Sequence, residues 1–257
     1  MNTSALWVAF YTIFSKEIRR FMRIWGQTLL PPAITMVLYF IVFGSLIGPR
    51  IGRMGGADYI TFIVPGLIMM SVITNSYNNV VSSFFGNKFQ RSIQEMLVSP
   101  TPSWVILAGY VCGSVTRGLL VGILVTMVSL TFTSLPIHSI VTLALVVLIT
   151  AIVFSLAGMI NALFAKNFDH ISIVPTFVLT PLTYLGGVFY SVDLLAEPWQ
   201  SLSRLNPILY MVNAFRYGFL GISDVRLEVA FAMLAAFMVG LSLLCYWLLY
   251  TGKGIRE

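Results

Sequence analysis

The sequence predicts an all-α integral membrane protein: six transmembrane helices, an N-terminal amphipathic interface helix and an extracellular re-entrant hairpin before the last helix. Three observations predict this fold. The 257 residues are 58% hydrophobic and 9% charged, whereas soluble domains are about a quarter charged. Apolar runs long enough to cross a bilayer recur along the chain. The charged residues gather in short segments between these runs, as they do at the faces of a membrane.

The same composition argues against other classes of protein. The net charge of +6 suits nucleic-acid binding, but the basic residues form no stripe and no known motif, so we expect no nucleic-acid partner. Cys112 and Cys245 both lie in apolar stretches, and a disulfide framework is not expected. The first long apolar run starts near Gln27, too late and too long for a signal peptide, so we expect insertion through an uncleaved first span.

Residues 1–26 are predicted to form an interface helix that does not span. On a helical projection of residues 5–25, apolar side chains gather on one side and basic ones on the other, with Glu17 out of place at the edge. A basic amphipathic helix lies in the plane of the lipid headgroups. Two interpretations stay open, a plain membrane anchor and a helix that also contacts a cytoplasmic partner.

Residues 27–187 are predicted to hold spans one to five. The second of these carries Pro65-Gly66, which a helix in lipid tolerates only near its end or where it packs on protein. A fifth apolar run, 171–192, contains Pro175 and Pro181 and is expected to be kinked or half-length. The four unbroken spans are expected at about 27–48, 59–85, 104–132 and 140–164.

Residues 188–227 mix charged and aromatic side chains, too polar for a span and too aromatic for a free loop. We predict a re-entrant hairpin of two short helices there, followed by span six and a cytoplasmic tail in 228–257. Nine basic residues fall on the N-terminal side of this topology and five on the far side, which favours cytoplasmic N- and C-termini. They are Lys16, Arg19, Arg20, Arg23, Lys88, Arg91, Lys166, Lys253 and Arg256 against Arg50, Arg53, Arg204, Arg216 and Arg226.

The loop 86–103 is predicted to contain a short amphipathic helix that prolines at 100 and 102 end. Its charged residues include Arg91 and Glu95. Its apolar residues recur at helical spacing and are expected to share one face, which either rests on the membrane as a connector or docks a cytoplasmic protein. They are Phe89, Ile93, Met96 and Leu97.

Catalytic chemistry is not expected. The stretch nearest to a phosphate-binding loop, residues 251–254, lacks the leading glycine spacing and the following Ser or Thr. No cofactor or metal set converges, and His138 and the Asp169-His170 pair are interpreted as loop residues. The predicted spans hold no carboxylate of the kind that ion-coupled carriers use. The energy for any transport is therefore expected to come from another protein.

Arg117 is the charged residue deep inside a predicted span. An arginine near a helix centre costs at least about 2.5 kcal/mol on insertion scales, so a compensating partner is expected. In one interpretation Arg117 faces the bundle and binds backbone carbonyls or an amide. In the other it lines a transport path and binds an anionic headgroup. The candidate amides are Asn75, Asn78, Asn79 and Asn161.

Over its whole length the chain resembles the membrane subunits of type-2 ABC exporters. The resemblance rests on the amphipathic N-terminus and on a set of segments in a fixed order around six spans. These are residues 62–67 (FIVPGL), 88–100 (KFQRSIQEMLVSP), 174–190 (VPTFVLTPLTYLGGVFY), 205–210 (LNPILY) and 215–218 (FRYG).

The resemblance implies a permease of the bacterial cytoplasmic (inner) membrane, in which a homodimer of this chain works with separate ATP-binding cassette ATPase subunits. It implies that the loop after the second span is a coupling helix and that the hairpin closes the outer end. Expected substrates are amphipathic or lipid-linked. The residues that would contact the ATPase are Phe89, Arg91, Ile93 and Glu95. The alternatives are a self-contained channel or secondary carrier, and an intramembrane enzyme or assembly factor.

Overall fold

The structure, a computed structural model, describes residues 2–254 apart from the side chain of Leu97. Leu97 and Arg256, which enter the predictions above, therefore lie outside its described part. The helices, in chain order, are α1 (Thr3–Arg23), α2 (Trp25–Thr28), α3 (Leu30–Tyr39), the π-helical η1 (Phe40–Ile47), α4 (Gly48–Ile51), α5 (Tyr59–Phe89), α6 (Ser92–Val98), α7 (Ser103–Ser129), α8 (Ile140–Phe164), α9 (Phe168–Val174), the π-helical η2 (Pro175–Leu179), α10 (Thr180–Leu185), the 3-10 turn η3 (Val192–Leu194), α11 (Glu197–Arg204), α12 (Pro207–Leu220) and α13 (Leu227–Thr251). The strands are β1 (Arg53–Met54) and β2 (Ala57–Asp58).

Within residues 2–254, five helices are long and apolar enough to cross a membrane. They are α5, α7, α8, α13 and the composite helix Trp25–Ile51, and they correspond to the predicted spans one to four and six. The predicted fifth run is α9, η2 and α10 in succession, with a π-helical segment beginning at Pro175. The helix runs on from Phe168 to Leu185, and the π-helical segment is a distortion of the kind that its prolines predict.

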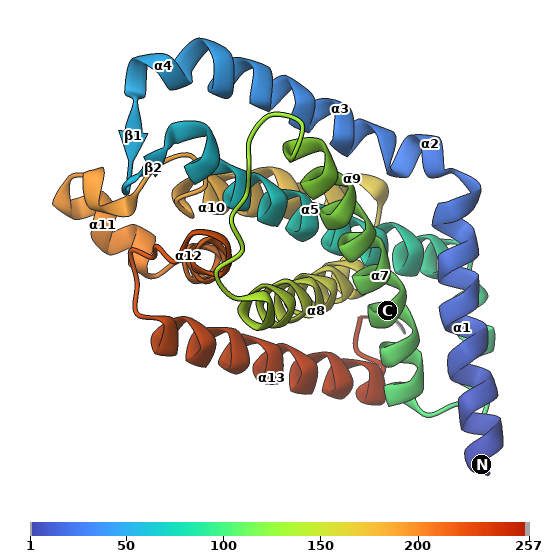
Figure 1. Cartoon of the computed structure of the whole chain (residues 1–257). Helices are drawn as coiled ribbons and strands as arrows, with labels where there is room; N and C mark the ends of the chain where they lie inside the picture. The colour runs from blue at the N-terminus through green and yellow to red at the C-terminus, as the bar shows by residue number, and fades with distance from the viewer. Residues whose placement is uncertain (1, 255–257) are drawn as a thin grey trace.

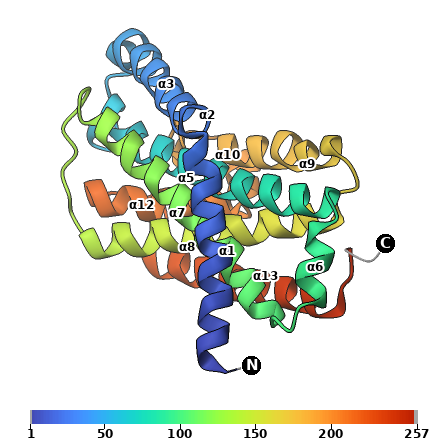
Figure 2. The same cartoon turned by 90° about the vertical axis from the view of Figure 1, so that its right-hand side faces the viewer.

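Helix α5 is the centre of the bundle (Figure 1). In its most apolar stretch 78% of the residues are buried, against 11% in Trp25–Ile51 and 17% in α13. Both views show α3 and α13 at opposite edges with α5 and α8 between them (Figure 2). The two edge helices therefore present most of their apolar surface to lipid or to another protein.

Helix α7 packs closely on two neighbours through two small-residue pairs that we did not single out in the sequence. A Cβ added at Gly113 would lie 2.5 Å from Glu17 Cβ on α1, and one at Gly118 would overlap Ser76 Oγ on α5. Gly109 and Gly122 meet Ile13 and Val72 in the same way. These are two successive Gly-x-x-x-Gly pairs, the spacing that lets membrane helices approach closely.

Helix α1 stands across the ends of the bundle helices and packs against α7 (Figure 2). Its buried residues are Ile13, Glu17 and Phe21, while Trp7 is 66% exposed. The predicted apolar side supplies Ile13 and Phe21, so among the buried residues of α1 it is Glu17 that departs from the predicted division. Glu17, expected at the edge, is fully buried because it faces Gly113 and polar groups of α5.

The polar loop after the first span forms the small hairpin β1–β2, which turns at Gly55 and Gly56 with φ of 59° and 88°. The Pro65-Gly66 pair lies near the start of α5 and packs on protein, as predicted. A Cβ at Gly66 would lie 2.7 Å from the Val188 carbonyl oxygen, so only glycine permits this contact.

The block 188–227 contains the two predicted helices, α11 and α12, but they differ in environment. Ten residues of α12 are buried, and this helix packs against α5, α8 and α13. Arg216, counted above among the far-side basic residues, is fully buried within α12. The surrounding segments supply its hydrogen-bond partners.

Candidate functional site

The junction between α5 and α6 is a sharp bend at Arg91. Phe89 is the last residue of α5, not part of the loop helix as predicted, and α6 begins at Ser92. Arg91 has φ of 60°, and among residues 2–254 it is the non-glycine residue with positive φ. A left-handed backbone at such a residue costs about 1–2 kcal/mol. The bend lets α6 leave the axis of α5.

Helix α6 divides into a buried and an exposed side. Ile93 is 1% exposed and belongs to the core of the chain. Arg91, Gln94, Glu95 and Val98 are exposed. The predicted single apolar face therefore does not form, because Ile93 is turned into the bundle while Phe89 stays 60% exposed. A partner would meet Arg91, Glu95 and Phe89 but not Ile93.

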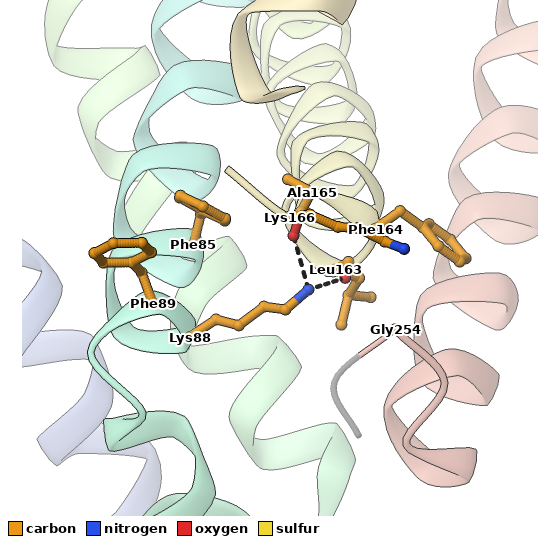
Figure 3. Close-up of a pocket in the computed structure, with 8 residues that line it drawn as sticks. All are labelled: Phe85, Lys88, Phe89, Leu163, Phe164, Ala165, Lys166 and Gly254. Atoms are coloured by element: carbon orange, nitrogen blue, oxygen red, sulfur yellow. Dashed lines mark hydrogen bonds between the residues drawn. The ribbon is translucent and has the colours of Figure 1, made fainter. Parts of the chain in front are cut away.

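Lys88 joins the end of α5 to the end of α8 (Figure 3). Its ammonium group donates hydrogen bonds to the carbonyl oxygens of Leu163 at 2.5 Å and Ala165 at 2.9 Å. A cation at these carbonyls satisfies the C-terminus of α8 and complements its dipole. A cavity of about 310 Å³ opens beside this contact, between α5, α8 and Gly254 (Figure 3).

Aromatic side chains surround this cavity and were not singled out in the sequence. The Phe168 ring lies 5.1 Å from the Phe85 ring and 5.1 Å from the Phe89 ring. Phe89, Phe164 and Phe168 are each more than half exposed. An exposed aromatic group at the end of a bundle is typical of a protein interface. The sequence signal was a phenylalanine at both ends of the turn 165–167.

Arg117 is paired with amides of α5, as the first of the two interpretations predicted. Its two Nη atoms donate to Asn75 Oδ1 at 3.2 Å and to Asn79 Oδ1 at 3.4 Å. Of the other two candidates, Asn161 donates to the Ile171 carbonyl oxygen, whereas Asn78 lines the same cavity as Arg117. Arg117 Nε is buried without a partner among the described residues. The guanidinium therefore retains donors that these amides leave unused.

Asn79 connects Arg117 to α1. Arg20 donates to Asn79 Oδ1 at 2.7 Å and to Glu17 at 3.2 Å. Ser83 donates to the other oxygen of the same buried carboxylate. A cluster with two guanidinium groups and one carboxylate thus lies between α1, α5 and α7, and Glu17 compensates the charge of Arg20.

A polar groove runs along α5 beside this cluster. Arg117 lines a cavity of about 300 Å³ between α5 and the helices α2 and α3. A smaller cavity of about 90 Å³ lies between α5 and the segment 175–184. Met70 and Thr74 line both cavities, so this side of α5 is open along its middle.

Arg216 in α12 is a buried cation that binds groups from several segments of the chain. Its guanidinium donates to the carbonyl oxygens of Gly187 at 2.6 Å and Phe62 at 3.3 Å, and it lies 3.8 Å from the centre of the Phe62 ring. Asp224 approaches it to 4.0 Å. Three segments remote in sequence thus share one buried cation.

The sequence model of the ABC-2 type transporter family matches residues 8–220. The chain belongs to this family. It is 64% identical to the inner membrane transport permease YadH of Escherichia coli K12, over 98% of each chain. It is 26% identical to nodulation protein J of Rhizobium leguminosarum bv. viciae, over 75% of this chain and 76% of that protein.

This membership makes the chain the membrane permease subunit of an ABC transporter, a class that works with a separate ATPase subunit. The family match covers residues 8–220 and so includes most of α1, all of α6 and the residues of the Arg117 cluster. The sequence predicted only part of the cluster. The asparagines of α5 identified one side of it, while Glu17 and Arg20 looked like surface residues.

Proposed function

We propose that this chain is the membrane subunit of an ATP-driven exporter that moves an amphipathic or lipid-linked substrate across the bacterial inner membrane. Five long apolar helices and the distorted helix α9–η2–α10 support six spans with both termini in the cytoplasm. The 64% identity to an inner membrane transport permease of Escherichia coli supports a location in the inner membrane. In this topology α11 and α12 form the re-entrant hairpin that closes the outer end of the path.

The observation that carries the proposal is the geometry of α6. This helix of seven residues is held between two long helices, and its exposed side carries Arg91 and Glu95. Phe89 adds an exposed ring. We propose that these three residues contact the ATPase and that Ile93 couples by anchoring α6 in the bundle. A displacement of α6 by the ATPase would then be transmitted directly to α5.

The open groove of α5 supports a working unit with two copies of this chain. The groove carries polar side chains at the depth of the spans, and lipid does not satisfy such groups. A second copy facing the first would enclose the groove between two bundles. The resulting path would contain Arg117 from each subunit. Native mass spectrometry of the detergent-solubilised complex tests this, and a complex with a single permease chain would refute it.

The experiment that tests the proposed function is reconstitution with the ATP-binding subunit and measurement of ATP-driven transport. Glu95→Ala is the informative variant. A charge pair that becomes buried on docking costs about 3–5 kcal/mol when one partner is removed, whereas an exposed one costs under about 1 kcal/mol. We expect Glu95→Ala to insert normally and to lose coupling. Glu197→Ala, an exposed carboxylate on α11, is the matched control and should transport normally.

Two results would refute the proposal. The first is robust ATP hydrolysis by this chain alone, because no subunit would then be needed to supply energy. The second is transport by Glu95→Ala at the rate of the Glu197→Ala control. This result would show that α6 only connects two spans and does not couple to the ATPase.

A further inference from the structure

We infer that the cavity between α2, α3, α5 and α7 binds the anionic headgroup of an amphipathic molecule, with Arg117 as the group that recognises the anion. The inference rests on the proposed function and names the chemical class of its substrate.

The charge balance favours an anion. The cluster contains Arg20, Arg117 and Glu17, so its formal charge is +1. The Glu17 carboxylate is occupied by Arg20 and Ser83. In the described part of the chain, Arg117 has no carboxylate within ion-pair distance. A bound monoanion would neutralise the cluster and remove the cost of an uncompensated charge at this depth.

The donors around the cavity are available for a ligand. Arg117 donates to two neutral amide oxygens at 3.2 and 3.4 Å, longer than the charge-assisted bonds of about 2.7–2.9 Å that guanidinium groups form with anions. Its Nε has no partner among the described residues, and the Ser71 hydroxyl, on a residue 4% exposed, has none either. Ser71 and Arg117 both line the same cavity.

The shape of the cavity suits a molecule with a polar head. One wall is a stripe of α5 with polar side chains at Ser71, Thr74, Asn75 and Asn78. The opposite wall, from α2 and α3, adds Pro31 and Met36. Its volume of about 300 Å³ is at the small end of ligand sites. It accepts a headgroup, while the attached chains would remain outside in lipid.

The position of the cavity indicates the direction of entry. It begins at Gln27 and Thr28, directly after α1 and its junction, and α1 lies across the ends of the bundle helices (Figure 2). In the proposed topology this end is cytoplasmic. The headgroup of a molecule in the inner leaflet would therefore meet the cavity without crossing the bilayer first.

Binding by the purified full-length chain in detergent tests the inference without any ATPase. The probes are dioctanoyl phosphatidate, dioctanoylglycerol with the same tails and no anion, and inorganic phosphate. We expect the wild-type chain to bind phosphatidate at least tenfold more tightly than dioctanoylglycerol. Arg117→Gln should weaken phosphatidate binding by about tenfold or more, the loss typical of a charge-assisted hydrogen bond. Arg204→Gln, the same change at an exposed site on α11, should have no effect.

A second variant covers the case in which Arg117→Gln does not fold. Ser71→Ala removes a buried hydroxyl that has no described partner, so the fold should be kept while phosphatidate affinity falls about threefold. Equal binding of phosphatidate and dioctanoylglycerol would overturn the inference, as would wild-type affinity in Ser71→Ala and Arg117→Gln. Displacement of phosphatidate by millimolar inorganic phosphate would show a site for free anions and would overturn the amphipathic ligand. Failure of ATP-driven transport leaves this binding assay unaffected.

Discussion

Arg216 on α12 donates a hydrogen bond of 2.6 Å to the carbonyl oxygen of Gly187, 29 residues earlier in the chain. The same guanidinium reaches the start of α5 through Phe62 and approaches Asp224 after α12. Because Gly187 itself has φ of 69°, its carbonyl points in a direction that a residue with negative φ does not provide. One buried side chain therefore links α12 to the Gly187 turn and to the start of α5.

We expect Arg216→Gln to lower the thermal stability of the purified protein markedly. The substitution leaves two carbonyl oxygens without their donor and Asp224 without its cation, and breaking a buried ion pair typically costs about 3–5 kcal/mol. Thermal unfolding in detergent measures the effect. Arg204→Gln is the control, since Arg204 is exposed. Equal melting temperatures for the two variants would show that the buried contacts of Arg216 do not stabilise the fold.

Gly66→Ala should destabilise the protein by about 1–3 kcal/mol through overpacking. The new methyl group would lie 2.7 Å from the Val188 carbonyl oxygen, a backbone atom that has little freedom to move. Gly240→Ala in α13 is the matched control, because nothing lies within 4 Å of its added Cβ. There the higher helix propensity of alanine should stabilise by up to about 1 kcal/mol. The two substitutions should therefore shift the melting temperature in opposite directions. If both raised it, the contact between Gly66 and the Val188 carbonyl oxygen would have room for a methyl group.

Arg91→Gly and Arg91→Ala separate the backbone of the α5–α6 bend from the side chain. Glycine accepts φ of 60° without strain, so Arg91→Gly should raise stability by about 1 kcal/mol, whereas Arg91→Ala should not. Both variants lose the guanidinium, and under the proposed coupling both should lose ATP-driven transport. Parallel thermal unfolding and transport assays measure this. Transport by either variant at the wild-type rate would remove Arg91 from the coupling surface.

Single cysteines at Asp193 and Glu228 test the proposed hairpin, in a background lacking Cys112 and Cys245. Both positions are exposed and flank α11 and α12. Asp224 is less suitable, because its side chain is 10% exposed and faces Arg216. We expect impermeant thiol reagents to label both cysteines from outside intact cells. Labelling from opposite sides would mean that the block 188–227 crosses the membrane and that the six-span topology is wrong.

The spans were predictable because an apolar run of about 20 residues is a local signal. Arg117 was predictable in part, since a cation inside a span needs partners and the asparagines of α5 lie in the neighbouring span. The burial of Glu17 and Ile93 was not predictable in this way. Helical periodicity defines the faces of a helix, but it does not say which face another segment covers. For Glu17 that segment lies 66 residues further along the chain, at Ser83.

This separation in sequence has a consequence for assembly in the membrane. The groups that satisfy Glu17 and Arg20 are Ser83 and Asn79 on α5, and the glycines that admit α1 are on α7. During synthesis α1 emerges before all of them, so its acidic and basic residues must remain hydrated at the membrane surface until two later spans have been inserted. Helix α1, although made before α5 and α7, can therefore dock only after both of them are in place.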